Sequence, residues 1–273
     1  MPSLSRRPVV PVVRLAGTIA AGEAFRARLN LASVAAPLDK AFAVRNAPAV
    51  AILINSPGGS PVQAHLIFRR IRALAAEKKK PVLAFVEDVA ASGGYMIAIA
   101  GDEIIADPYA IVGSIGVVSA GFGFTGLMEK LGVERRMHTA GRSKAMLDPF
   151  LPEKRDDVKR LAELQESVHD AFIAMVKERR PGLRDNDGEL FSGAFWLAPK
   201  ARDFGLVDRL GDLRSVLRER YGPKVRLPIY GGRQRGLFRR WFSGRAAADL
   251  AAGSLDAMIG AIEDRALWRR YGL

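Results

Sequence analysis

Two glycine-rich turns constrain this sequence most, because each separates a short apolar run from a segment with helical character. The apolar run at 49–54 leads into Asn55-Ser56-Pro57-Gly58-Gly59, and the run at 82–86 precedes Ala90-Ala91-Ser92-Gly93-Gly94. Short runs rich in β-branched residues are typical of buried strands, and glycine-rich turns end them. Strands that alternate with helices predict an α/β fold with a mainly parallel sheet.

The same patterns predict the other elements. We expect strands at 9–13, 49–54, 82–86, 103–106 and 135–139. We expect helices from Ser60 or Pro61 up to the break at Pro81, then at 95–100, 125–131 and 152–180, with a second turn-and-helix unit through Arg220 and a final amphipathic helix between Leu250 and Ile262. Helical spacing puts Val62, Leu66, Ile67 and Ile71 on one apolar face, and Leu161, Leu164, Val168, Phe172 and Met175 on another.

Length and composition allow one large domain with an appendage. The chain has 273 residues, of which 49% are apolar and 26% are charged, so a core of useful size is available. A glycine- and proline-containing basic stretch follows Tyr221, and we place a boundary there. The predicted domains are 1–222 and a basic linker with an amphipathic C-terminal helix at 223–273.

Cysteine and histidine content excludes several chemistries. The chain has no cysteine and three histidines, His65, His138 and His169. A cysteine nucleophile, a thiolate metal site and a disulfide framework are therefore excluded, and a histidine-rich metal cluster has little room. We expect no metal and no organic cofactor.

The net charge of +13 is concentrated near the C-terminal end, where ten basic residues and one acidic residue lie between Arg214 and Arg245. Such a segment is either a solvated tail or a surface for an anionic partner. Arginines and aromatic residues interleave in 233–245, which suits an anionic membrane surface. Nucleic acid is not the expected partner.

Targeting signals are weak. The apolar run at 9–13 is interrupted by Pro11 and ended by Arg14, so it is too short for a signal peptide. The uncharged stretches 46–68 and 108–128 are long enough to span a bilayer, but prolines or glycines break both. We expect no transmembrane helix and a cytoplasmic protein, with peripheral attachment to the inner membrane as an open alternative.

Ser92 is the candidate nucleophile. It stands where a strand gives way to a helix, between small neighbours that would let a substrate backbone approach. The free N–H groups of a helix start favour negative charge beside such a serine. Capping of the helix is the competing interpretation of this serine.

The glycines of both turns are candidate oxyanion-hole donors. Carboxyl ends of parallel strands share one edge of a sheet, so the two turns should lie close together. The backbone N–H groups of Gly59 and Gly93 could then stabilise an oxyanion, or the glycines could serve turn geometry only.

A serine nucleophile needs a base, and the histidines stand outside the polar turns. A lysine becomes a base when burial lowers its pKa. Lys144 is the candidate, since Gly141-Arg142-Ser143-Lys144-Ala145-Met146-Leu147 sets it beside apolar residues, unlike the lysines of charged runs. A surface loop is the alternative for this residue.

Four ordered motifs closely resemble the signal peptide peptidase A (SppA/SohB-type) serine peptidases in their half-length form. They are 51–59, 90–95, Gly113-Ser114-Ile115-Gly116-Val117 and 141–144, and the stretch 206–211 looks like that family's closing motif. The resemblance covers roughly 49–221. It implies a Clp-protease/crotonase-like fold and a Ser/Lys dyad.

By position, Ser92 matches the family's nucleophile, Lys144 its general base and Ser114 the serine that orients the lysine. Gly59 and Gly93 match the oxyanion-hole donors. The resemblance also implies a homo-oligomer in which neighbouring subunits supply the serine and the lysine of one site, with the 108–128 stretch at subunit contacts. We expect two departures from the family: no N-terminal membrane anchor, and the basic extension after Tyr221.

The sequence therefore predicts a serine endopeptidase that cleaves signal-peptide remnants or other apolar peptides. A crotonase-like enzyme that processes acyl-CoA is one alternative, since that fold shares the paired-amide oxyanion hole. A non-catalytic membrane-binding scaffold that uses 233–245 is another.

Overall fold

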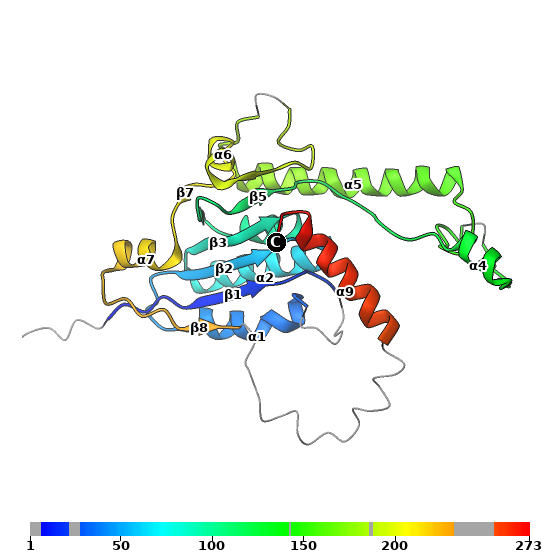
Figure 1. Ribbon diagram of the computed structural model, residues 1–273. Helices are drawn as coiled ribbons and strands as arrows, with labels where there is room; N and C mark the ends of the chain where they lie inside the picture. The colour runs from blue at the N-terminus through cyan, green and yellow to red at the C-terminus, as the bar shows by residue number, and fades with distance from the viewer. Residues whose placement is uncertain (1–6, 22–27, 142, 186–187, 232–253) are drawn as a thin grey trace, which may run out of the picture. The chain divides into compact units, whose positions relative to one another are not determined.

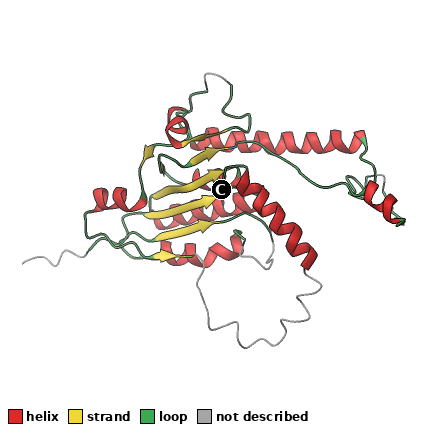
Figure 2. Cartoon of the chain, viewed as in Figure 1, coloured by secondary structure: helices red, strands yellow, loops and turns green. Residues whose placement is uncertain are grey.

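The computed structural model describes residues 7–21, 28–141, 143–185, 188–231 and 254–273. The chain divides into two compact units. We call the first, Met1–Ile115 with Val176–Leu273, the sheet unit, and the second, Gly116–Met175, the insert unit. Figure 2 separates the helices, in red, from the strands, in yellow.

A sheet of eight strands, counted over the described residues, organises the sheet unit (Figure 1). The strand order is β6-β5-β3-β2-β1-β8, and β4 pairs with both β3 and β7. The pairing of β5 with β6 is antiparallel and the other pairings are parallel. The strands are β1 (Val12–Ala16), β2 (Val50–Ser56), β3 (Val82–Ala91), β4 (Glu103–Ala106), β5 (Ile111–Gly113), β6 (Phe195–Leu197), β7 (Arg209–Leu210) and β8 (Ile229–Tyr230). The prediction of an α/β fold with a mainly parallel sheet is confirmed.

The central strands are apolar almost throughout because both faces of the sheet are covered. On one face, Val216 and Leu217 of helix α7 (Leu213–Tyr221) pack with residues of β1 to β4, including Val12, Ala51 and Phe85. Helices α1 (Leu31–Phe42) and α2 (Pro61–Lys78) run along the sheet in Figure 1. Strand β3 is longer than predicted, since its last residues pair with β5.

Helix boundaries follow local capping chemistry. Asn30 and Ser33 form a capping box at the start of α1, with N–H···O distances of 2.9 and 3.1 Å. Ser60 caps α2 and Pro61 occupies its first turn, as the sequence predicts. The predicted apolar face of α2 is half wrong. Ile67 and Ile71 are buried, but Val62 is 64% exposed and Leu66 lies on the surface.

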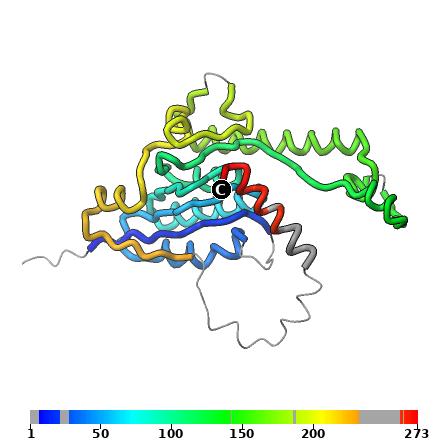
Figure 3. Tube along the Cα trace, in the orientation of Figure 1, coloured from blue at the N-terminus to red at the C-terminus, as the bar shows by residue number. Residues whose placement is uncertain are grey.

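Three further helices complete the sheet unit: α3 (Gly93–Ala98), α6 (Ala198–Asp203) and α9 (Ser254–Arg269). Helix α3 begins two residues before the predicted start at 95. Helix α9 continues past Ile262, the last residue of the predicted C-terminal helix, and the amphipathic character of this helix stays a prediction. The tube in Figure 3 brings the red C-terminal end of the chain beside β3.

The insert unit contains α4 (Thr125–Leu131) and most of α5 (Arg155–Arg179). Helix α4 ends at Gly132, as predicted, because this residue adopts a left-handed conformation at the C-cap. The predicted strand at 135–139 is wrong: these residues form an exposed loop without a pairing strand. Leu164 and Val168 of the predicted α5 face are also exposed in this chain.

The described residues contain no helix that is both long and apolar enough to cross a membrane. Most of the predicted linker, including the 233–245 membrane segment, lies outside the described residues. The boundary after 222 therefore stays a prediction.

Candidate active site

The carboxyl ends of β2, β3 and β5 meet at one edge of the sheet. Register pairs Ser56 with Ala90 and Ala91 with Gly113, so the turns that follow these three strands are neighbours. The Ser92 N–H donates to the Gly113 carbonyl at 2.9 Å and joins two of the turns directly. The expectation that the glycine-rich turns share an edge is confirmed.

Ser92 stands between β3 and α3 in an unusual backbone conformation, with φ +53° and ψ −123°. A residue other than glycine pays about 1–3 kcal/mol for such a conformation, and residues of this kind cluster at functional sites. The Ser92 side chain makes no capping hydrogen bond to α3, although it occupies the N-cap position. The capping interpretation is therefore wrong, and the hydroxyl remains available for chemistry.

Gly59 and Gly93 lie next to each other beside Ser92. A Cβ built on Gly93 would come within 3.5 Å of the Gly59 nitrogen, and a Cβ on Gly58 would come within 2.8 Å of the Ser92 Cβ. Among the backbone hydrogen bonds that turns, loops and caps form in the described residues, none is donated by the N–H of Gly59 or of Gly93. Gly93 is also the first residue of α3, and the first N–H groups of a helix have no acceptor within the helix. Two such N–H groups beside a hydroxyl are what an oxyanion hole requires.

Tyr95 anchors the helix that follows Ser92. Its ring is fully buried, and its hydroxyl donates to the Leu206 carbonyl at 2.9 Å. Burial raises the pKa of the Tyr95 phenol well above its usual range, so this group stays a neutral donor. The start of α3 is thereby tied to the segment before β7.

Ser114 follows β5 at the same edge and is only 6% exposed. Its φ is +54°, and its N–H donates to the Ala194 carbonyl at 2.6 Å, which extends the β5–β6 pairing. Its Oγ accepts a hydrogen bond from the Tyr271 hydroxyl at 3.3 Å. The structure therefore brings four of the five predicted site residues to one edge of the sheet unit.

Lys144, the fifth predicted residue, belongs to the insert unit. It lies in a turn closed by its own N–H, which donates to the Gly141 carbonyl at 3.2 Å, and its side chain is exposed. The next three residues, 145–147, are half-buried. Within one chain, the exposed side chain of Lys144 agrees with the alternative interpretation of this residue as part of a surface loop.

The three histidines lie on helices or in an exposed loop. His65 stacks on Phe68 of α2 with ring centroids 6.3 Å apart, His138 is exposed in the loop of the insert unit, and His169 lies on α5. No group of three or more His, Cys, Asp or Glu side chains suited to a metal ion occurs in the described part of the chain.

Sequence reasoning missed Tyr271, which lies at this edge of the sheet. It is separated from Ser114 by 157 positions, and the contact depends on how α9 packs. Periodicity and motif spacing carry no signal for such a contact.

Most of this chain is similar to parts of longer known proteins. The chain is 56% identical over 272 residues to the Na(+)/H(+) antiporter NhaA of Brucella abortus (strain 2308), a match that covers 97% of this chain and 37% of that protein. It is 32% identical to the chloroplastic serine protease SPPA of Arabidopsis thaliana, covering 77% of this chain and 32% of that protein. The chain therefore spans about a third of the length of these relatives.

The fold is similar to that of a mutant 1510-N membrane-bound stomatin-specific protease in complex with a substrate peptide. The TM-score is 0.53 at 17% identity, over 85% of this chain and 95% of that chain. This agrees with the Clp-protease-like fold that the motifs imply. The model of the family described as "Peptidase family S49" matches residues 75–221. This match covers more than half of the chain and includes Ser92, Ser114 and Lys144. A peptidase family is thereby favoured over the acyl-CoA alternative, and this chain belongs to peptidase family S49.

Proposed function

We propose that the chain is a serine peptidase in which Ser92 attacks a peptide carbonyl. The observation that carries the proposal is the strained backbone of Ser92, whose hydroxyl caps nothing and lies beside the N–H groups of Gly59 and Gly93. These two groups stabilise the oxyanion that develops during attack. The family assignment supplies independent support.

In this mechanism Lys144, when neutral, takes the proton from Ser92 as the hydroxyl attacks. The same lysine then protonates the leaving amine, and water hydrolyses the acyl-enzyme. Ser114 orients the lysine. Because Lys144 is exposed in its own chain, we propose that the site is completed in a homo-oligomer, where a neighbouring subunit supplies the lysine.

The proposed substrates are extended apolar peptides, such as remnants of signal peptides. Protease names among the relatives and the peptide complex of the similar structure support a peptide substrate. The antiporter name of the Brucella relative, we propose, refers to the part of that longer protein that lies outside the match, because the family S49 match falls within the shared region.

Hydrolysis of fluorogenic apolar peptides at neutral to alkaline pH tests the proposal. Ser92→Ala and Lys144→Ala should each lower kcat at least about a hundredfold, since each removes a member of the reacting pair. Lys159→Ala, which removes another exposed lysine of the insert unit, is the matched control and should keep wild-type activity. Full activity of folded Ser92→Ala would overturn the proposal, and full activity of Lys144→Ala would overturn the choice of base.

A further inference from the structure

The C-terminal turn of α9 holds Tyr271 in a fixed position. Its N–H donates to the Trp268 carbonyl at 3.0 Å, and the Leu273 N–H donates to the same carbonyl at 3.3 Å. Gly272 adopts φ +75°, the left-handed conformation that commonly ends a helix. Tyr271 is therefore held by the backbone of a completed helix end.

The Tyr271 ring packs against the strand that delivers Ser92. It is 6% exposed and forms an apolar cluster with Val89 and Ala91 of β3. The Phe195 ring meets it edge-on, with centroids 5.0 Å apart. Ala91 directly precedes Ser92, and Figure 1 shows the end of α9 beside the arrowhead of β3.

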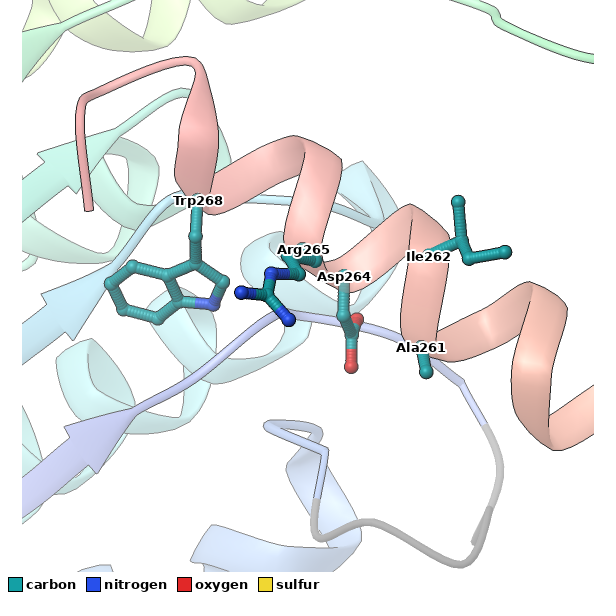
Figure 4. A pocket seen from close by; sticks show the side chains of 5 residues that line it. All are labelled: Ala261, Ile262, Asp264, Arg265 and Trp268. Carbon is teal, nitrogen blue, oxygen red and sulfur yellow. The ribbon is translucent and has the colours of Figure 1, made fainter.

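Helix α9 docks through its C-terminal part. Trp268 joins the same cluster beside Ile111. Five residues of α9 line a pocket of about 400 Å³ (Figure 4): Ala261, Ile262, Asp264, Arg265 and Trp268. Tyr271, two residues beyond the end of α9, packs against Val89 and Ala91 of β3.

The Tyr271 hydroxyl donates a hydrogen bond to the Oγ of Ser114 at 3.3 Å. A serine hydroxyl carries one proton and two lone pairs. A bond accepted from Tyr271 occupies one lone pair and restricts rotation of the hydroxyl. The Ser114 proton and its other lone pair are then left for a second partner.

We propose that Tyr271 is a positioning residue of the active site, which acts by fixing the Ser114 hydroxyl that orients the catalytic lysine. The inference rests on the proposed function, because it takes the role of Ser114 from there. It extends the site to a residue 50 positions beyond the family match, which ends at residue 221. The C-terminal helix α9 thereby contributes to the active site, because it holds Tyr271 against Ser114.

A double-mutant cycle tests this role. Tyr271→Phe removes the hydroxyl and keeps the ring, and it should lower kcat about fivefold while KM stays within about twofold. Ser114→Ala should lower kcat at least as much. The double variant should be no slower than Ser114→Ala, because the tyrosine has nothing left to position.

The same four proteins are compared in a second measurement, the rate at which a peptidyl phosphonate labels Ser92. This rate reports attack by the serine and needs no hydrolysis of a peptide substrate. Tyr221→Phe is the matched control, since this half-buried tyrosine packs against the apolar cluster under α7. It should leave both rates unchanged.

Two results would overturn the inference: wild-type rates in Tyr271→Phe, or a Tyr271→Phe effect that recurs undiminished in the Ser114→Ala background. The second result would mean that the Tyr271 hydroxyl acts independently of Ser114. Failure of the proposed function has a different signature, namely full activity and unchanged phosphonate consumption in Ser92→Ala.

Discussion

Two serines at the candidate site adopt positive φ values that favour glycine, +53° for Ser92 and +54° for Ser114. Each conformation is held by a hydrogen bond from the residue's own N–H, to the carbonyls of Gly113 and Ala194. The fold therefore offsets a backbone cost of about 1–3 kcal/mol at each of two adjacent turns. Such strain orients a side chain away from its own helix or strand, which is what a reactive hydroxyl needs.

Gly59 should tolerate no side chain. Its φ is +131°, and a Cβ added there would lie 2.1 Å from the Ile19 carbonyl oxygen. We expect Gly59→Ala to lower the free energy of unfolding by at least about 2 kcal/mol and to abolish peptide cleavage. Urea unfolding of the folded variant measures the first effect.

Gly121→Ala is the control, because a Cβ there would meet no atom within 4 Å. It should unfold within about 0.5 kcal/mol of the wild type. Equal stability of the Gly59 and Gly121 variants would contradict the packing described around Ile19.

Prediction from the sequence placed residues correctly where a local motif marks them, and the catalytic roles of these residues stay predictions. The glycine-rich turns and the motif order indicated Ser92, Gly59, Gly93 and Ser114, and the structure gathers these at one edge. It failed for Tyr271, whose contact with Ser114 depends on tertiary packing of α9. The role of Lys144 stays a prediction, since its side chain is exposed in the insert unit.

Elements were predictable where caps and breakers are strong. Helix α4 and strand β4 occur at the predicted residues, and Ser60 caps α2 as expected. Apolar faces were less predictable, because helical spacing does not reveal which neighbours cover a face. Val62 of α2 and Leu164 of α5 are exposed for this reason.

Helix α7 depends on its cap, and the dependence should vary with pH. The Asp212 Oδ1 accepts hydrogen bonds from the N–H groups of Arg214 and Ser215, both at 2.9 Å. The hydroxyl of Ser215 and these backbone bonds hold the pKa of the Asp212 carboxyl below its usual value. A lowered pKa stabilises the fold above the unfolded-state value, and this contribution is lost as pH falls through the folded-state pKa.

Asp212→Ala should therefore cost about 1 kcal/mol at neutral pH. The difference from wild type should shrink as the pH falls below about 4, where the unfolded carboxyl takes up its proton. Thermal unfolding across this range checks it, with Asp170→Ala as a control for loss of an exposed carboxylate on α5. A difference that grows on acidification would contradict the capping role.

At the scale of the whole molecule, the insert unit exposes many large apolar side chains. They include Val118, Phe122, Leu127, Leu131 and Val133, each more than half exposed. Large apolar side chains that gather on a surface are typical of protein interfaces. It supports the proposed homo-oligomer, in which this surface faces other copies of the chain.

Subunit mixing tests whether sites are shared. Inactive Ser92→Ala and Lys144→Ala proteins, unfolded together and refolded as mixed oligomers, should regain part of the wild-type peptidase activity. A Lys144→Ala subunit still offers its serine, and its Ser92→Ala neighbour still offers a lysine. Mixed oligomers that form but stay inactive would show that each chain builds its own site.

The central claim is that Ser92 is the nucleophile, and covalent trapping tests it most directly. The protein is treated with an apolar peptidyl diphenyl phosphonate, which reacts with activated serine hydroxyls, and the modified residue is located by peptide-mapping mass spectrometry. The account predicts one adduct, on Ser92, with loss of peptidase activity in proportion to labelling. An adduct on another serine with the same loss of activity, or loss of activity without any serine adduct, would contradict it.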